Sequence, residues 1–253
     1  MRFVRYKWDN RIFYGIVEGD NVRRIDLSPF IDWKLLDESH PLSEVRLLAP
    51  AEPSKIVAVG LNYINHADEL KMDVPSEPIL FLKPTTAVIG PGEPIFYPAM
   101  SKQVDFEAEV GVVIKDEAKG ISESEAKEAI LGYTCANDVT ARDLQRRDGQ
   151  WGRCKSFDTF APIGPWIDTE VDPMDIRVES VLNGRVMQSS TTEDMIFDIY
   201  KLVSFISKVM TLLPGDVIMT GTPPGVGPMQ PGDIIEIKIE DIGVLRNTIT
   251  GSD

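Results

Sequence analysis

The first fifty residues alternate between hydrophobic and polar positions over short runs. These runs cover residues 2–6, 13–17 and 22–25, and the turn-forming residues 19–21 separate the last two. Such alternation is the period of a β-strand that buries one face, and Gly-Asp-Asn is typical of a tight turn. The pattern therefore predicts a small β-rich N-terminal domain over residues 1–50.

Two prolines, Pro50 and Pro53, then interrupt the pattern. Proline disfavours both a continuing helix and a central strand, so we place a domain boundary here and predict a larger domain over residues 51–253. Strands outnumber helices in it, and the predicted fold class is α+β, mainly β. Its strand-like runs cover residues 55–60, 79–82, 108–114, 177–182, 217–219 and 234–239.

Three segments combine helical spacing or a helix-start signal with a plausible end. In the longest, apolar residues recur every three or four positions, and Pro214-Gly215 follows it as a stop signal. The predicted helices are residues 124–131 with a Ser122-x-x-Glu125 capping box, residues 140–147 with Thr140-x-x-Asp143, and residues 194–212 with Glu193 and Asp194 at the N-terminal end.

Charge and composition exclude several classes of protein. The 253 residues carry a formal net charge of -14, which repels nucleic acids and anionic membranes. No apolar run is long enough for a membrane helix, and residues 1–20 lack the apolar centre of a signal peptide. The two cysteines, Cys135 and Cys154, lack the spacing of a zinc site. We expect a cytoplasmic protein with reduced thiols.

The segment 104–114 carries the first candidate chemistry. If it is one strand, Asp105, Glu107 and Glu109 share one face and the apolar residues share the other. One interpretation is an edge strand with a solvated acidic face. The other is a site where a cation lies opposite the carboxylates, because unpaired carboxylates near the core are costly. The strand alone does not separate the two.

Asp138 favours the second interpretation. It follows an apolar run at residues 133–136 and precedes the predicted helix at residue 140. A helix N-cap or an Asx turn is the alternative role for this residue. Together with Glu107 and Glu109 it forms an all-oxygen donor set, which suits Mg²⁺ or Mn²⁺. Since His40 and His66 are the only histidines, a histidine-rich metal site is excluded.

These residues resemble the motifs of the fumarylacetoacetate hydrolase family. That family has an E-x-E strand, here residues 107–109, followed by N-D-x-[ST]-A-R-D, here residues 137–143. The resemblance extends over nearly all of residues 55–250. Further segments similar to family motifs are residues 60–69 (G-x-N-Y-x-x-H-x-x-E), 81–84 (F-x-K-P), 155–158 (K-[SG]-F-D) and 221–227 (GTPxGVG).

The resemblance implies a mixed β-sandwich roll for the catalytic domain, with Mg²⁺ or Mn²⁺ on Glu107, Glu109 and Asp138. It also implies a homodimer and a role such as aromatic catabolism, and Trp151 and Trp166 are candidates for the interface. The large member of the family has a fourth acidic ligand. Asn62 stands near that position here, so we expect water to complete the coordination.

Further candidates surround this predicted metal site. His66 and Glu69 lie three residues apart, so on a helical turn the carboxylate can orient the imidazole as a general base. A chance surface pair is the alternative, and the family pattern favours the base. Lys155 is the third catalytic candidate. Candidates for binding the substrate are Lys83, Arg142, Gln145 and Thr222. The lysines could instead be ordinary surface residues, and Arg142 could pair with a structural acid such as Asp158.

The expected function is a magnesium-dependent reaction of a small, anionic, enolisable 2-oxo acid. In this hypothesis Mg²⁺ binds the 1-carboxylate and the 2-oxo oxygen and lowers the energy of an enolate at C3. The outcome is hydrolysis of an acylpyruvate or decarboxylation of oxaloacetate. Isomerisation of 5-carboxymethyl-2-hydroxymuconate or 2-hydroxyhepta-2,4-diene-1,7-dioate is the alternative. A non-catalytic, metal-containing binding protein would not need His66 and Glu69.

Overall fold

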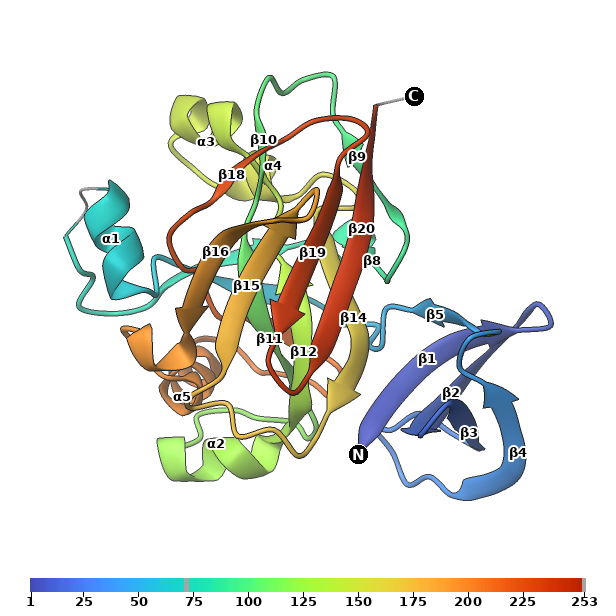
Figure 1. The fold of residues 1–253 in the computed structure, drawn as a ribbon. Coiled ribbons are helices and arrows are strands. Elements are labelled where there is room, and N and C mark those ends of the chain that lie inside the picture. Colours follow the sequence, from blue (N-terminus) through green and yellow to red (C-terminus); the bar gives the residue numbers. More distant parts are fainter. Residues whose placement is uncertain (71–72, 252–253) are drawn as a thin grey trace.

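The structure is a computed structural model that describes residues 1–70 and 73–251, without the side chains of residues 67, 68 and 70. Residues 71–72 and 252–253 of the predicted second domain lie outside this description. Strands dominate the described chain and form three sheets (Figure 1). The predicted class, α+β and mainly β, is confirmed.

The largest sheet has 12 strands among the described residues, in the order β4-β3-β2-β1-β14-β12-β11-β17-β6-β7, while β5 pairs with β1 and β8 with β14. Its strands are β1 (Arg2–Trp8), β2 (Arg11–Glu18), β3 (Asn21–Ile25), β4 (Leu35–Pro41), β5 (Arg46–Leu48), β6 (Ile56–Gly60), β7 (Ile79–Lys83), β8 (Val88–Ile89), β11 (Ala108–Ile114), β12 (Ile130–Asn137), β14 (Ala161–Asp168) and β17 (Val217–Met219).

The N-terminal strands extend this sheet to one side of the molecule, at the lower right of Figure 1. β1 pairs antiparallel with β14, so that Arg2 lies opposite Asp168 and Phe3 opposite Ile167. The three strands and the turn predicted within residues 1–25 are present. The division at residue 50 stays a prediction, because strand pairing joins the two parts.

The second sheet has five strands in the order β16-β15-β19-β20-β9 and packs on β11, β12 and β14. The alternation of apolar and charged residues along its strands explains which face of this sheet points toward the core. Ile235 and Ile237 are buried in the shared core, whereas Glu236 and Lys238 are partly exposed. Its strands are β9 (Pro94–Tyr97), β15 (Arg177–Leu182), β16 (Arg185–Thr191), β19 (Ile234–Ile239) and β20 (Gly243–Gly251).

The acidic segment 104–114 forms two strands in different sheets. The strand predicted over residues 108–114 is present, but Asp105 and Glu107 do not belong to it, contrary to the interpretation of one strand over the whole segment. β10 (Val104–Phe106) lies between β13 (Thr140–Ala141) and β18 (Gly227–Met229) in the third sheet. After Glu107 the chain enters the large sheet as β11, between β12 and β17. Glu107 therefore lies at the junction of two sheets.

The helices differ from the prediction at their starts and at their ends, since those predicted to end at residues 131 and 212 end two and three residues earlier, at Ala129 and Val209. α2 (Glu123–Ala129) begins with the predicted box of Ser122 and Glu125. α3 (Arg142–Asp148) starts two residues late, because Thr140 and Ala141 pair with β10 instead. The other helices of the described residues are α1 (Ile64–Leu70), α4 (Gly152–Lys155) and α5 (Ile199–Val209). Two 3-10 turns cover Thr85–Ala87 and Thr192–Asp194.

The predicted start of α5 at residue 194 is wrong by five positions. Residues 192–194 form only a 3-10 turn, and Asp198 caps the helix by accepting the N–H of Lys201. Asn62 prevents an earlier start, because it binds the backbone N–H groups of Ile196 and Phe197. The predicted apolar face is buried, and α5 packs on α2.

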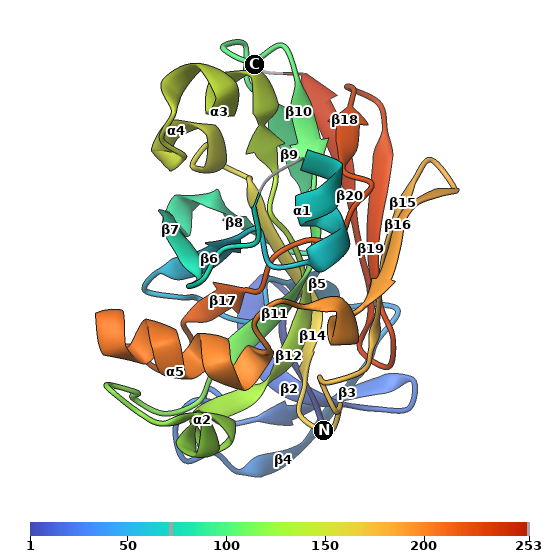
Figure 2. The same cartoon turned by 90° about the vertical axis from the view of Figure 1, so that its left-hand side faces the viewer.

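α1, α3 and α4 lie in the upper half of the molecule, whereas α2 and α5 lie in the lower half (Figures 1 and 2). Both cysteines are free and buried. In the part of the chain that the structure describes, no helix has the length and apolar composition needed to cross a membrane.

Candidate metal centre and active site

Glu107, Glu109 and Asp138 form one buried cluster. One carboxylate oxygen of each lies within 4.8 Å of the others, and no residue of the three is more than 5% exposed. Glu107 lies between β10 and β11, Glu109 is on β11, and Asp138 follows the last residue of β12. The backbone N–H of Asp138 donates to the carbonyl of Glu107 at 3.0 Å. The alternative of a solvated edge strand is therefore wrong, and Asp138 does not cap α3.

Two buried lysines lie against this cluster. Nζ of Lys155 is 2.8 Å from Oε2 of Glu107 and 2.6 Å from Oδ2 of Asp138. Nζ of Lys83 contacts Oδ1 of Asp138 and donates to the carbonyl of Val139 at 3.2 Å. Asp138 thus has a cation at each carboxylate oxygen. These contacts hold both acids in place, and their charges offset one another.

Arg142 holds the other side of Glu107. Its Nη2 is 2.5 Å from Oε1 of Glu107, its Nε is 2.8 Å from Oδ2 of Asp105, and its Nη1 donates to Oε1 of Gln145 at 2.7 Å. Every nitrogen of the guanidinium therefore faces an acceptor in the protein. The acids it pairs with are Asp105 and Glu107, whereas the sequence suggested Asp158. Asp105 lies outside the cluster of three carboxylates.

The titration of these groups follows from burial and from the neighbouring charges. Burial favours protonated Glu107, but Lys155 and Arg142 outweigh it and hold the pKa of Glu107 far below its ordinary value. Burial raises the pKa of Glu109 well above its ordinary value, and the carboxylates of Asp138 and Glu107 add to this. In the absence of a bound cation, Glu109 therefore favours its neutral, protonated form more than an exposed glutamate does.

This arrangement fits a hard divalent cation. Three oxygen donors converge without any nitrogen or sulfur ligand, which is the chemistry that Mg²⁺ and Mn²⁺ prefer. A cation at the cluster would also relieve the repulsion that raises the pKa of Glu109. Glu107, Glu109 and Asp138 are the residues that would hold it.

The loop 221–227 supports Glu109 from the other side. The N–H of Gly221 donates to Oε2 of Glu109 at 2.7 Å. Gly221 has φ +96°, and a Cβ there would lie 2.6 Å from Cβ of Asn62, so the close approach requires glycine. The Asn62 side chain binds the backbone of Phe197 and Thr220 and is no member of the carboxylate cluster.

Gln188 is a residue of the site that the sequence analysis missed. It is buried on β16, accepts the N–H of Ala108 and donates to Oγ1 of Thr222 and to the carbonyl of Pro223. The Thr222 hydroxyl donates in turn to the carbonyl of Ala108 at 2.9 Å. One glutamine thus joins the carboxylate strand to the loop. A single glutamine in a strand gives no signal in the sequence.

His66 and Glu69 meet on α1 as their spacing predicted. Nδ1 of His66 is 2.9 Å from Oε2 of Glu69, and Glu69 also accepts the N–H of Gly225. His66 is 5% exposed and its imidazole lines the cavity described below, whereas Glu69 is exposed. The carboxylate therefore fixes the imidazole and links α1 to the loop 221–227.

One cavity of about 330 Å³ connects these groups. His66, the three carboxylates, Lys155, Arg142, Gln145 and Thr222 line it, whereas Lys83 lies behind Asp138 and does not. The apolar part of its wall is formed by Phe81 and Trp151, whose rings meet edge-on at 5.2 Å. The size and this mixed wall suit a small polar molecule with a short carbon chain.

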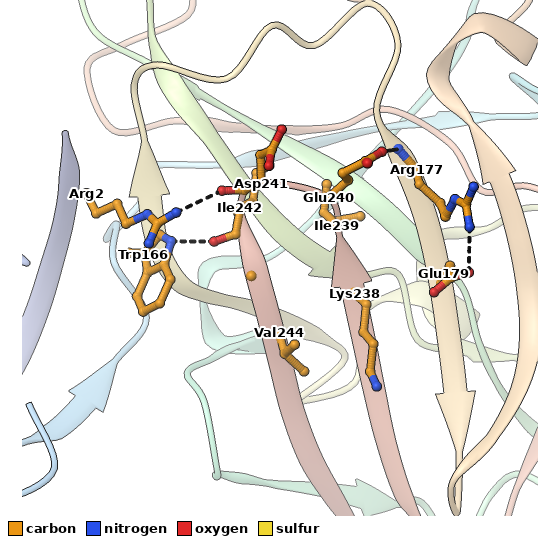
Figure 3. A pocket seen from close by; sticks show the side chains of 11 residues that line it. Arg2, Trp166, Arg177, Glu179, Lys238, Ile239, Glu240, Asp241, Ile242 and Val244 are labelled. Carbon is orange, nitrogen blue, oxygen red and sulfur yellow. Dashed lines mark hydrogen bonds and ion pairs between the residues drawn. The ribbon is translucent and has the colours of Figure 1, made fainter. Parts of the chain in front are cut away.

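A larger hollow of about 540 Å³ lies elsewhere, over β15, β19 and β20 (Figure 3). Its polar groups bond to one another: Arg2 donates to the carbonyl of Asp241, the Trp166 indole donates to the carbonyl of Ile242, and Arg177 binds Glu240 through its backbone. It is the more open of the two and contains none of the buried carboxylates. The smaller cavity is therefore the candidate active site.

Comparison with known proteins agrees with this choice of site. The model of the fumarylacetoacetate (FAA) hydrolase C-terminal family matches residues 55–250, which include every residue of the cavity wall. The chain belongs to the fumarylacetoacetate hydrolase family. A second model, Rv2993c-like, N-terminal, matches residues 1–50.

Relatives within the family span nearly the whole chain. A protein of Archaeoglobus fulgidus is 52% identical over 244 residues, which cover 96% of this chain and 94% of the relative. The mitochondrial oxaloacetate tautomerase Fahd2a of Rattus norvegicus is 41% identical over 221 residues, covering 83% of this chain and 71% of the relative. The second relative is named as an enzyme.

Solved structures show the same fold. The 5-carboxymethyl-2-hydroxymuconate delta-isomerase from Mycobacterium smegmatis superposes with a TM-score of 0.94 at 46% identity, over 100% of both chains. The maleylpyruvate hydrolase from Sphingobium sp. SYK-6, solved with manganese (II) ion and pyruvate, gives 0.84 at 29% identity, also over 100% of both chains. The predicted family and fold are thereby confirmed.

Proposed function

We propose that the protein is a divalent-metal-dependent enzyme that acts on a small 2-oxo acid able to form an enolate at C3. The observation that carries this proposal is the meeting of two parts in one cavity. The buried carboxylates Glu107, Glu109 and Asp138 form the first, and the imidazole of His66, which Glu69 contacts from outside the cavity wall, forms the second. A purely structural metal site would not need an oriented imidazole beside it.

A Mg²⁺ or Mn²⁺ ion on the three carboxylates would polarise the 2-oxo acid and lower the energy of its enolate. The chain's own groups prepare the site for this. Lys155 and Arg142 keep Glu107 ionised, and Gly221 orients Glu109 through its N–H. Gln145 presents its amide beside Arg142 at the cavity wall, where it would bind the substrate.

His66 would move the protons. Its Nδ1 is held by Glu69, which leaves Nε2 as the nitrogen that can accept a proton from water or from carbon. The Glu69 carboxylate stabilises the imidazolium that results. The helix α1 that carries both residues contacts the loop 221–227 through Glu69, which accepts the N–H of Gly225.

With an acylpyruvate, the outcome is hydrolysis of the C3–C4 bond. Water gives a proton to His66 and its oxygen adds to the C4 carbonyl. The C3–C4 bond then breaks, its electron pair moves to C3 to form the enolate of pyruvate, and the C4 fragment leaves as a carboxylic acid. The enolate takes a proton at C3. With oxaloacetate, loss of carbon dioxide from C4 gives the same enolate.

A second candidate is proton transfer without bond cleavage. His66 would remove a proton from C3 and return it to another carbon or to oxygen, which is isomerisation or keto–enol tautomerisation. The names of the Mycobacterium smegmatis isomerase and the rat oxaloacetate tautomerase support this outcome. Both candidates need the same carboxylates and the same base.

The test is a panel of acetylpyruvate, fumarylpyruvate, oxaloacetate and hydroxymuconate-type diacids, each with Mg²⁺, Mn²⁺ or a chelator. Loss of the enol absorbance and product analysis by NMR separate cleavage, decarboxylation and proton transfer. We expect metal-dependent turnover of at least one substrate, abolished in Glu109→Ala. Absence of any metal-dependent change would favour the non-catalytic binding protein. Full turnover in Glu109→Ala would contradict the metal site.

We further propose that the protein acts as a homodimer in the cytosol, as the family resemblance implies. Trp151 belongs to the cavity wall, whereas the indole N–H of Trp166 donates to the carbonyl of Ile242 outside that cavity. Trp166 is therefore the better interface candidate of the two. Size-exclusion chromatography with light scattering measures the mass directly. A mass of one chain, 28.2 kDa, at micromolar concentration would contradict the dimer.

A further inference from the structure

The lysine and arginine side chains beside the three carboxylates form ion pairs with acids of the protein itself. Lys155 contacts Glu107 and Asp138, and Arg142 contacts Asp105 and Glu107. These pairs are buried, so each cation already has a carboxylate partner at hydrogen-bond distance. They can hold the site together, but they provide little uncompensated positive charge for a second anionic group on the substrate.

Arg146 differs from these residues. It follows Gln145 on α3, lines the same cavity of about 330 Å³ and is exposed. Among the residues whose side chains the structure describes, none forms an ion pair with it. The next residue, Arg147, is paired with Asp148 and does not line the cavity. Two adjacent arginines on one helix therefore have different surroundings.

Exposure places Arg146 at the entrance. Glu107, Glu109 and Asp138 are at most 5% exposed and form the floor, whereas Arg146 faces solvent. The rings of Phe81 and Trp151, which are half-buried, form an apolar wall of the same cavity. A ligand that fills the cavity would meet oxygen ligands at one end, a hydrocarbon surface at the wall and a guanidinium at the other end.

We propose that Arg146 is a specificity residue that binds the distal carboxylate of a dicarboxylic 2-oxo acid. Its 2-oxo end would lie at the three carboxylates, its carbon chain against Phe81 and Trp151, and its distal carboxylate at Arg146. This inference rests on the proposed function, since it needs the 2-oxo end at the floor. It goes further by naming the group at the other end of the substrate.

Electrostatics supports this assignment. The chain has a formal net charge of -14, so a dianionic substrate is repelled unless a local cation offsets the field. A guanidinium can bind a carboxylate with two parallel hydrogen bonds, which selects an acid over an ester or a methyl group. Arg146 is the lining cation for which the structure shows no acid partner among the described side chains.

The test compares Arg146→Gln with the matched control Arg147→Gln. The substrates are a 2,4-dioxo acid with a terminal carboxylate and the methyl ester of that carboxylate, which differ only at the distal end. We expect Arg146→Gln to lower kcat/KM for the diacid by about 10- to 100-fold, mainly through KM. The ester should change less than about twofold, and Arg147→Gln should leave both values unchanged.

A binding experiment separates this inference from the proposed reaction. Isothermal titration calorimetry in the presence of Mn²⁺ compares a six-carbon 2-oxo diacid with the six-carbon 2-oxo monoacid. Wild type should prefer the diacid, and Arg146→Gln should lose that preference. Equal losses for both ligands, or an unchanged preference, would overturn the role of Arg146. If no substrate is turned over but the preference depends on Arg146, the proposed reaction fails and the inference stands.

Discussion

Nζ of Lys155 lies 2.6 Å from Oδ2 of Asp138, and the two side chains are 3% and 1% exposed. A buried ammonium group therefore neutralises a carboxylate that we assign to the metal. The same ammonium is 2.8 Å from Glu107. The lysine thus contacts two of the three carboxylates that would hold the metal, so its contribution to stability would depend on metal binding.

Replacing Lys155 with Met should destabilise the metal-free protein by about 3 kcal/mol, because it leaves two buried carboxylates without their shared partner. Saturating Mn²⁺ should recover much of this loss by neutralising the same carboxylates. Urea unfolding with and without Mn²⁺ measures both values. The control is Lys55→Met, which breaks a pair with buried Asp216 outside the cavity and should lose stability equally under both conditions. If Lys155→Met lost the same stability with and without Mn²⁺, the metal assignment would be contradicted.

Replacing Glu109 with Gln should remove the response to metal without unfolding the protein. Burial and the carboxylates of Asp138 and Glu107 raise the pKa of Glu109, so a neutral amide there relieves repulsion. Its carbonyl can still accept the N–H of Gly221. We expect a Tm equal to or above that of the metal-free wild type.

Thermal unfolding with Mn²⁺ gives the decisive comparison for this variant. At about 100 times its Kd, a ligand stabilises the native state by about 2.7 kcal/mol. Wild type and the exposed control Glu128→Gln should show the corresponding rise in Tm, whereas Glu109→Gln should show none. A normal rise in Glu109→Gln would mean that the ion binds elsewhere.

Replacing His66 with Gln should slow turnover while leaving metal binding intact. Loss of a general base typically costs about 100-fold or more in rate. Glu69→Gln should have a smaller effect, because the imidazole remains but is no longer fixed by a carboxylate. The chain supplies its own control in His40, the other histidine, which packs on Trp8 and Phe13 in the N-terminal strands.

Steady-state kinetics and Mn²⁺ calorimetry on the three variants distinguish catalysis from structure. We expect His40→Gln to keep the wild-type kcat. A variant His66→Gln with weakened Mn²⁺ binding would indicate a structural role for the imidazole. An unchanged kcat in that variant would exclude His66 as the base.

The sequence contains the local part of this site. Spacing by two residues brings Glu107 and Glu109 together, and an acid at the end of an apolar run adds Asp138. Helical spacing predicts that His66 and Glu69 meet, but the family pattern is needed to favour this pair over a chance surface pair. Residues close in sequence or on a regular period can be brought together in this way, whereas the joining of Asp138 to Glu107 and Glu109 also relies on the family motifs.

The rest depends on contacts between distant segments. α3 starts at Arg142 because Thr140 pairs with Asp105 across two strands. α5 starts late because Asn62, 135 residues before Phe197, binds the backbone there. The contacts of Gln188 with Ala108 and Thr222 are equally remote. No local pattern encodes such contacts, so the sequence missed them, and it suggested Asp158 as an acid partner of Arg142 in place of Asp105 and Glu107.

The final prediction concerns the wall of the cavity. Gly60 ends β6 directly beneath the indole of Trp151, and a Cβ at Gly60 would lie 2.2 Å from Cζ3 of that ring. Real contacts are never this short, so Gly60→Ala must displace the half-buried indole. Because Trp151 and Phe81 form the apolar wall, we expect KM to rise several-fold while Mn²⁺ affinity stays within about twofold.

Gly152 provides the matched control, since a Cβ at this neighbouring position meets nothing within 4 Å. Gly152→Ala should therefore keep the wild-type KM. A double variant, Gly60→Ala with Trp151→Phe, gives the smaller ring room to shift and should recover part of the lost affinity if the clash is the cause. Kinetics on the four proteins checks this. A rise in KM that the second substitution leaves unchanged would place the effect of Gly60 in the backbone of β6 instead of the cavity wall.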